Sequence, residues 1–297
     1  MPDEDSTERD AILLTAVAAC RAAGRLVTGR GRVDSESKAN AHDLVTSFDA
    51  EAERLVTEMI LGAHPGSSVV GEESGVSGNT DGEADLRWFV DPIDGTGNFA
   101  RGLPLFCVSI GVEKADSLEI GCIYDPVRGE MFTTTGPADG VRVDARHVED
   151  PPPGPGAARP LMLLTDFPLA GMPASGAELA LFAELNQTFD LRRVGSSALA
   201  LAWVAAGRAD LACNIAIHPW DVAAGFALVN AASGGYLPLR PPRTAAGERR
   251  PYEEGGFVAH GPHVSPDAAA FLAKRILDLP GAATPPRGGT ERTGGHG

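Results

Sequence analysis

Two carboxylates and a hydroxyl stand close together where a short apolar run ends. Residues 86–90 read LRWFV and lead directly into DPIDGT at 91–96. The run is short, aromatic and β-branched, which predicts a buried strand closed by a turn. Pro92 restricts the backbone of this turn, and Gly95 allows backbone angles that a side chain would forbid. Such a turn can direct Asp91 and Asp94 toward one point. Such a pair could bind a hard cation, although an ordinary surface turn has the same composition.

Two further acids occupy comparable positions. Glu72 follows the apolar residues 68–70, and Asp221 opens an apolar stretch with helical character. An acid in the first turn of a helix is favoured by the helix dipole and, taken alone, indicates a cap. If these acids met Asp91 and Asp94 without a cation, each pair of charges about 4 Å apart would cost about 4 kcal/mol at an effective dielectric of 20. Convergence therefore requires a metal ion.

The motifs around these acids resemble those of one known family, the inositol monophosphatases, which are Mg²⁺-dependent and lithium-sensitive members of the sugar phosphatase superfamily. Three motifs carry the resemblance: GEES at 71–74, DPIDGT at 91–96 and WDVAAG at 220–225. Two weaker matches are DLVTSFD at 43–49 and VGSSA at 194–198. The resemblance runs from about residue 11 to about residue 272. It implies an α/β (α+β) fold, a layered αβαβα sandwich of the sugar phosphatase type.

The resemblance also implies two or three Mg²⁺ ions in each active site. A first ion would be held by Glu72, Asp91 and the carbonyl of Ile93, and a second by Asp91, Asp94 and Asp221. Ligands that are all oxygen suit Mg²⁺, whereas cysteine or histidine ligands would indicate zinc. Two such ions can clamp the attacking and leaving oxygens of an in-line displacement and lower the pKa of a bound water.

Three residues are implied to be catalytic. Thr96 would orient the attacking water, Asp49 would accept the hydroxyl proton of Thr96, and Glu72 would act beside them. Asp49 is also readable as an acid near the start of a helix over residues 47–64. Lys38 matches a basic position on a loop over the metal site, and a solvated surface lysine explains it equally well.

The substrate pocket follows from the same resemblance. Its implied residues are Asp94, Gly95, Thr96, Gly195, Ser196, Ser197 and Asn214. Gly95 and Thr96 would cradle the phosphate at the start of a short helix. Asn214 stands where inositol-specific relatives have a glutamate, and an amide lacks the charge that strengthens hydrogen bonds from hydroxyls or an amine. The identity of the alcohol part of the substrate therefore stays open.

These observations predict a Mg²⁺-dependent phosphomonoesterase that hydrolyses a small polyol, cyclitol or sugar phosphate with metal-activated water. An alternative is a phosphatase of a specialised-metabolite, nucleoside, nucleotide or histidinol phosphate on the same scaffold. A second alternative is a regulatory family member that binds a macromolecule. The resemblance implies a homodimer.

Composition agrees with this prediction. Forty acidic against 25 basic residues give a formal charge of −15, which makes a nucleic-acid or anionic-membrane partner unfavourable. The four cysteines are widely separated and predict buried thiols. The sequence has no basic start followed by an apolar stretch, and no apolar run approaches about 20 residues, so we expect a cytoplasmic protein.

The predicted organisation has five parts: a disordered N-terminus at 1–8, an N-terminal α+β metal-binding lobe at 9–148, a Pro/Gly-rich connection at 149–160, a C-terminal α/β lobe at 161–279 and a disordered tail at 280–297. Within the first lobe, strands are expected at 86–90, 104–114, 118–124 and 130–134. The last three are expected to form an antiparallel meander.

Overall fold

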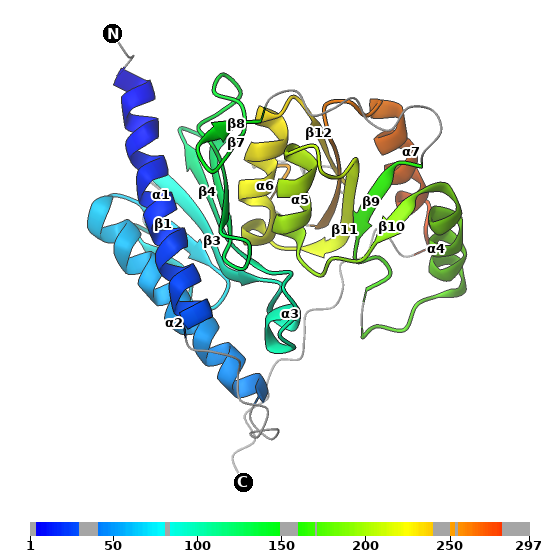
Figure 1. Cartoon of the computed structure of the whole chain (residues 1–297), viewed down its shortest axis with the longest axis horizontal. Coiled ribbons are helices and arrows are strands. Elements are labelled where there is room, and N and C mark those ends of the chain that lie inside the picture. Colours follow the sequence, from blue (N-terminus) through cyan, green and yellow to red (C-terminus); the bar gives the residue numbers. More distant parts are fainter. Residues whose placement is uncertain are drawn as a thin grey trace.

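The computed structural model describes residues 4–29, 41–80, 84–148, 160–169, 171–239, 250–252 and 255–280. Within these ranges two sheets alternate with three pairs of helices (Figure 1). Helices α1 and α2 cover one sheet, α5 and α6 lie between the two sheets, and α4 and α7 cover the far face of the second sheet. The fold is therefore the predicted layered αβαβα sandwich.

The first helical layer is α1 (Glu4–Gly29) packed beside α2 (Ala41–Ala63). Because α1 begins at Glu4, residues 4–8 are helical where the sequence predicts disorder, and residues 1–3 lie outside the described part. The apolar side chains of α1 recur every three or four residues and are buried: Ile12, Ala16, Ala19, Cys20 and Ala23. This helix is long and apolar enough to span a membrane by composition, but its apolar face packs into the core against the first sheet.

The first sheet has the strand order β2-β1-β3-β4-β5-β6-β7-β8. Its strands are β1 (Ser68–Gly71), β2 (Gly75–Gly78), β3 (Leu86–Asp94), β4 (Cys107–Lys114), β5 (Ser117–Asp125), β6 (Glu130–Thr134), β7 (Arg142–Val143) and β8 (Arg146–His147). β1 runs parallel to β3, and the other neighbouring strands are antiparallel. The predicted meander of β4, β5 and β6 is confirmed.

The central layer consists of α5 (Ser197–Ala205) and α6 (Pro219–Ala231), which are apolar on nearly every side. This composition fits helices buried between two sheets. The approach of α6 to the first sheet is so close that a Cβ added at Gly111 of β4 would lie 2.6 Å from the Cβ of Ala223. Since α5 and α6 come from the second half of the chain and pack on both sheets, the two predicted lobes share one core.

The second sheet has the order β10-β9-β11-β13-β12, in which β9, β10 and β11 are parallel. Its strands are β9 (Met162–Thr165), β10 (Asp190–Arg192), β11 (Leu211–Ile217), β12 (Gly235–Pro238) and β13 (Gly255–His260). Its outer face is covered by α4 (Gly176–Thr188) and α7 (Pro266–Leu277). The predicted connection at 149–160 lies outside the described residues except for Pro160, and so does the tail beyond residue 280.

Candidate functional site

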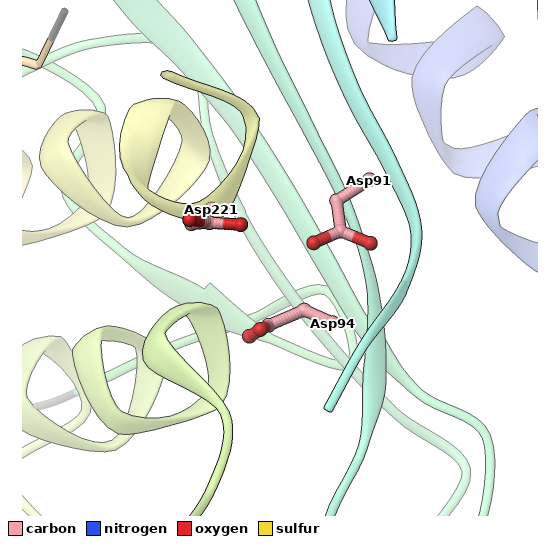
Figure 2. A group of neighbouring side chains, drawn as sticks. All are labelled: Asp91, Asp94 and Asp221. Atoms are coloured by element: carbon pink, nitrogen blue, oxygen red, sulfur yellow. The ribbon is translucent and has the colours of Figure 1, made fainter. Parts of the chain in front are cut away.

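Three carboxylates converge at one end of the first sheet. Asp91 and Asp94 come from the end of β3 and Asp221 from the first turn of α6, and one ligand oxygen of each lies within 4.8 Å of the others. Figure 2 shows the three carboxylates facing one another across the space between strand and helix. Asp91 and Asp94 are only 1% and 8% exposed. This group could hold a metal ion.

A β-bulge explains how both aspartates of β3 reach the same space. Three positions separate Asp91 from Asp94, so regular alternation would place their side chains on opposite faces of the sheet. In the pairing with β4, however, Asp91 lies opposite Ser109 and Asp94 opposite Cys107, which are two positions apart. The extra residue in β3 shifts the alternation by one and returns Asp94 to the face of Asp91. The sequence predicts a turn here, whereas the structure has an irregular strand that continues to Asp94.

The third carboxylate is fixed by the start of α6. Pro219 occupies the first turn of this helix, where the missing N–H costs nothing. The Asp221 carboxylate accepts a hydrogen bond of 2.6 Å from the backbone N–H of His218. Asp221 is therefore both a capping acid and a member of the three-acid group.

Burial and mutual repulsion raise the pKa values of these acids. Burial is the largest cause for Asp91, whose pKa lies well above its usual range, and the charges of Asp94, Asp221 and Glu72 add to it. Burial, followed by the charge of Asp94, raises the pKa of Asp221 to about 8. The pKa of Asp94 rises to about 6, because burial outweighs the hydrogen bonds that favour its charged form. A cation between these groups would offset both effects.

Asp94 is held by the second half of the chain. The hydroxyl of Ser196 donates to its carboxylate at 2.5 Å and the N–H of Ala198 donates at 2.6 Å. Ser196 is also the N-cap of α5, where its hydroxyl accepts from the N–H of Leu199 at 3.2 Å. Of the predicted substrate residues, Ser196 therefore contacts a metal-site acid directly. The start of α5 and the end of β3 form one hydrogen-bonded unit.

The predicted phosphate cradle has the expected backbone geometry. Gly95 is the N-cap of the short helix α3 (Thr96–Ala100) and has φ of 98°. A side chain at this position would be strained, and its Cβ would lie 2.8 Å from the carbonyl oxygen of Leu105. Asn98 of the same helix donates to the carbonyls of Leu105 at 2.6 Å and Val194 at 2.8 Å. Asn98 therefore attaches α3 to the loop before α5, a role the sequence analysis did not identify.

The hydroxyl of Thr96 has a different hydrogen-bond acceptor from the predicted one, which was Asp49. The hydroxyl of Thr96 donates to the carbonyl oxygen of Ile93 at 3.0 Å, and the N–H of Ile93 donates to the Asp91 carboxylate at 2.9 Å. Across the described ranges, no hydrogen bond joins Thr96 to Asp49. Asp49 is buried, and burial, followed by the charges of Glu72, Glu73 and Glu53, raises its pKa to about 8.

Glu72 lies beside the three-acid group but is not within its 4.8 Å limit. Its side chain is partly exposed. Partial burial, followed by the charges of Glu73, Asp94 and Glu53, raises the pKa of Glu72 to about 7. The turn that carries Glu72 is held by the buried carboxylate of Glu53 from α2. This carboxylate accepts from the N–H groups of Glu73 and Ser74 at 2.8 Å each, and from the Ser74 hydroxyl.

Glu53 was missed by the sequence analysis, although one signal could have found it. It follows Asp49 by four residues, so both acids lie on the same face of α2, and that face is buried by Ala52 and Val56. An acid with a buried apolar neighbour on each side is rarely a surface residue. Lys38, the other predicted residue of this region, lies outside the described residues.

The remaining predicted pocket residues form a network behind the start of α5. Asn214 is buried, and its amide oxygen accepts from the N–H of Asp166 at 2.7 Å, while its amide nitrogen donates to the Ser197 hydroxyl at 2.8 Å. The N–H of Gly195 donates to the Asp166 carboxylate at 2.9 Å. Both ends of the Asn214 amide are thus engaged within the protein, and its contact with substrate hydroxyls stays a prediction.

The four cysteines are free and buried, in agreement with the sequence analysis. Cys107 packs against the site, with its sulfur 3.9 Å from an Asp94 carboxylate oxygen and 3.7 Å from the Ser196 hydroxyl. Burial raises its pKa well above the usual range, so the thiol stays neutral beside the acids.

Comparison with known proteins places these features in context. The family model described as "Inositol monophosphatase family" matches residues 8–276. The Nus factor SuhB of Escherichia coli (strain K12) is 36% identical over 230 residues, which cover 75% of this chain and 83% of that protein. The structure of an inositol monophosphatase from Anabaena (Nostoc) sp. PCC 7120 superimposes with a TM-score of 0.69 at 30% identity and covers 90% of this chain and 96% of that one. The extragenic suppressor protein suhB of Bartonella henselae gives 0.70 at 27% identity and covers 89% and 98%.

The raised pKa values predict how stability depends on pH when no divalent cation is bound. Five carboxyls in and beside the three-acid group have folded-state pKa values above their ordinary ones: Asp49, Glu72, Asp91, Asp94 and Asp221. The folded protein therefore binds more protons than the unfolded chain between about pH 4 and pH 8, and the free energy of unfolding falls as pH rises through this window. In EDTA, we expect urea denaturation to give a loss of at least about 1 kcal/mol between pH 5.5 and pH 8.

The control for this experiment separates the site from general charge repulsion. Asp221→Asn should flatten the decline, whereas Asp278→Asn, which changes an exposed carboxylate of the C-terminal region, should leave it unchanged. A parent protein whose stability is constant or rises over this range would show that the acids are not crowded as described.

Proposed function

Because this chain belongs to the inositol monophosphatase family, we propose that it is a Mg²⁺-dependent phosphomonoesterase that hydrolyses a small polyol, cyclitol or sugar phosphate. The convergence of Asp91, Asp94 and Asp221 is the observation that carries this proposal. These ligands are all oxygen and largely buried, and their mutual repulsion calls for a hard cation. Family membership supports the hydrolysis of phosphate esters in general, and the choice of Mg²⁺ follows from the chemistry of the donors.

The metal ligands are proposed as follows. Glu72, Asp91 and the Ile93 carbonyl would hold a first ion, and Asp91, Asp94 and Asp221 a second, with two or three ions in each site. Glu53 supports this assignment because its hydrogen bonds fix the turn that carries Glu72. When bound, Mg²⁺ would lower the pKa of a coordinated water and balance the charge of the phosphate and of the leaving oxygen.

The protein groups around the ions would orient the water. Because the Thr96 hydroxyl donates its hydrogen to the Ile93 carbonyl, its lone pairs are left to accept a hydrogen bond from a water molecule. Asp49 is buried nearby with a pKa of about 8, so it can retain or release a proton near neutral pH. In this proposal Thr96 orients the water, and Asp49 and Glu72 accept or release the protons that the water exchanges.

The phosphate would sit at the start of α3, where Gly95 allows the backbone to approach closely. The loop of Gly195, Ser196 and Ser197 would close the other side of the pocket. Ser196 then has a double role, since its hydroxyl holds Asp94 in place. Asn214 would act by positioning this loop through Ser197 rather than by contacting the substrate.

Other properties of the proposal rest on likeness to the family. We propose a homodimer that works in the cytoplasm, is inhibited by lithium and has no membrane partner. The expected substrate is a small molecule, and the acidic charge of −15 disfavours nonspecific contact with nucleic acid.

A second candidate function is a regulatory one, in which the chain binds a macromolecule. It is favoured by one observation, the name Nus factor carried by the Escherichia coli relative. The presence of all the proposed metal ligands favours the enzyme. The two functions separate in one assay, because only the enzyme releases phosphate from small phosphomonoesters in the presence of Mg²⁺.

Asp91→Asn tests the enzyme directly. Asp91 is proposed to contact both ions, so the variant should lose at least about 100-fold in kcat for phosphate release at saturating Mg²⁺. Its thermal midpoint in EDTA should be equal to or higher than that of the parent, because the substitution removes one of several crowded charges. Asp190→Asn, at an exposed ion pair, is the control and should retain full activity. Near-normal turnover by Asp91→Asn would contradict the mechanism.

Glu53→Gln tests the support of the Glu72 turn. The glutamine keeps one acceptor oxygen but loses the charge that three donors share, so we expect about 10-fold weaker Mg²⁺ activation with little change in kcat at saturating metal. Titrating activity against Mg²⁺ measures this. Glu58→Gln, at an exposed position of the same helix, should match the parent. If Mg²⁺ activation weakens equally in both variants, or in neither, Glu53 does not support the metal site.

A further inference from the structure

Asp166 is an acid that the mechanism does not use, although it lies against the active-site loop. It follows the last residue of β9, and its carboxylate accepts a hydrogen bond of 2.9 Å from the N–H of Gly195. The next residue, Ser196, donates to Asp94. The charge of Asp166 is also one of the causes, after burial, that raise the pKa of Asp94. Asp166 therefore lies beside the proposed metal site on the side of the second sheet.

The carboxylate of Asp166 keeps capacity for another partner. A carboxylate offers about four acceptor positions, and among the residues that the structure describes the Gly195 N–H and the neighbouring Asn214 amide occupy at most two of them. The nearby guanidinium of Arg193 forms no ion pair with it and donates instead to backbone carbonyls, including those of Asp166 and Pro168 at 2.9 Å each. Asp166 is half-buried, and burial raises the pKa of its carboxyl although the nearby charge of Arg193 acts in the opposite direction.

The position of this carboxylate is rigid. Its backbone N–H is held by the Asn214 amide at 2.7 Å, its backbone carbonyl by Arg193, and its side chain by Gly195. Asn214 is in turn fixed by Ser197. A residue held at two backbone points and one side-chain point can select a ligand without first losing much conformational freedom. Asn214 itself is committed at both ends of its amide and has less to offer a ligand.

We propose that Asp166 is a specificity-determining residue that binds a hydroxyl or ammonium group on the alcohol part of the substrate. This inference rests on the proposed phosphatase function. The phosphate end is excluded as a partner because it carries the same charge as the carboxylate. The remaining hydrogen-bond donors of a phosphate ester belong to its alcohol part. An enzyme with a carboxylate at this point favours polyol or amino-alcohol phosphates over esters that lack donors.

The test compares three phosphate esters in the full-length enzyme with Mg²⁺: p-nitrophenyl phosphate, which has no donor on its alcohol part, inositol 1-phosphate and glucosamine 6-phosphate. Asp166→Asn keeps an acceptor for the Gly195 N–H and loses the charge. Asp210→Asn is the matched control, because the Asp210 carboxylate likewise accepts from one backbone N–H, that of Met162 at 2.7 Å, at the end of β9 opposite to Asp166. Thermal midpoints check that both variants are folded.

We expect Asp166→Asn to lower kcat/KM for at least one donor-bearing ester by about 10-fold or more relative to p-nitrophenyl phosphate, mainly through KM. Loss with both esters would identify hydroxyl recognition, and loss with glucosamine 6-phosphate alone would identify ammonium recognition. Should Asp166→Asn prove unstable, Asp166→Glu, which keeps the charge but moves it by one methylene, should change the same ratio.

Two results would overturn this inference. One is a selectivity within about 2-fold of the parent for both donor-bearing esters, and the other is an equal change in Asp210→Asn. In either case the parent still releases phosphate, so the proposed function survives. A parent that hydrolyses none of the three esters would instead contradict the proposed function, and the role of Asp166 would fall with it.

Discussion

Electrostatic repulsion among buried carboxylates is the constraint on which the rest of this structure depends. Asp91, Asp94 and Asp221 offer ligand oxygens within 4.8 Å of one another in a largely buried site. Two charges at such a distance repel by about 4 kcal/mol at an effective dielectric of 20, before the cost of desolvation is added. A fold of marginal stability tolerates this arrangement only if several parts of the chain hold the acids and their charge is offset by bound protons or by a cation.

Each layer of the sandwich contributes one of these supports. The bulge in β3 returns Asp94 to the face of Asp91, and the first turn of α6 delivers Asp221. The start of α5 donates two hydrogen bonds to Asp94. Hydrogen bonds to a charged group contribute about 1.5 to 3 kcal/mol each, which is comparable with the repulsion of one neighbouring charge. The site therefore joins both halves of the chain, and neither half could form it alone.

The close packing of the central layer is the second condition. α6 can place Asp221 beside β3 only because glycine and alanine line the contact between this helix and the first sheet. A Cβ at Gly111 would overlap Ala223, and one at Gly121 would lie 2.6 Å from the carbonyl oxygen of Ala224. Protein interiors do not absorb such overlaps without shifts of backbone. Small side chains in the middle of the molecule thus set the spacing of the acids at its edge.

The sequence predicted the family and the layered fold better than the geometry of the candidate site. The motifs at 71–74, 91–96 and 220–225 were sufficient for the family and for the layered fold, because ligand types and glycine positions are local properties. The bulge could not be predicted, since the register of β3 is set by its pairing with β4. The same holds for Glu53 and for the engaged amide of Asn214, whose partners lie about 20 to 50 residues away in the sequence. The helical residues 4–8 are stabilised by ion pairs with the distant Lys114, which no local pattern reveals.

The most direct measurement of the central claim is the position of bound metal. Crystals of the protein grown with Mn²⁺ as a substitute for Mg²⁺ can be measured at the manganese absorption edge, where anomalous scattering identifies the ion without reference to the protein geometry. We expect anomalous peaks between the carboxylates of Asp91, Asp94 and Asp221, with oxygen ligands at about the distances typical of hard cations. A fully metal-saturated crystal with no peak at this position would contradict the account, because the three acids would then remain crowded for another reason.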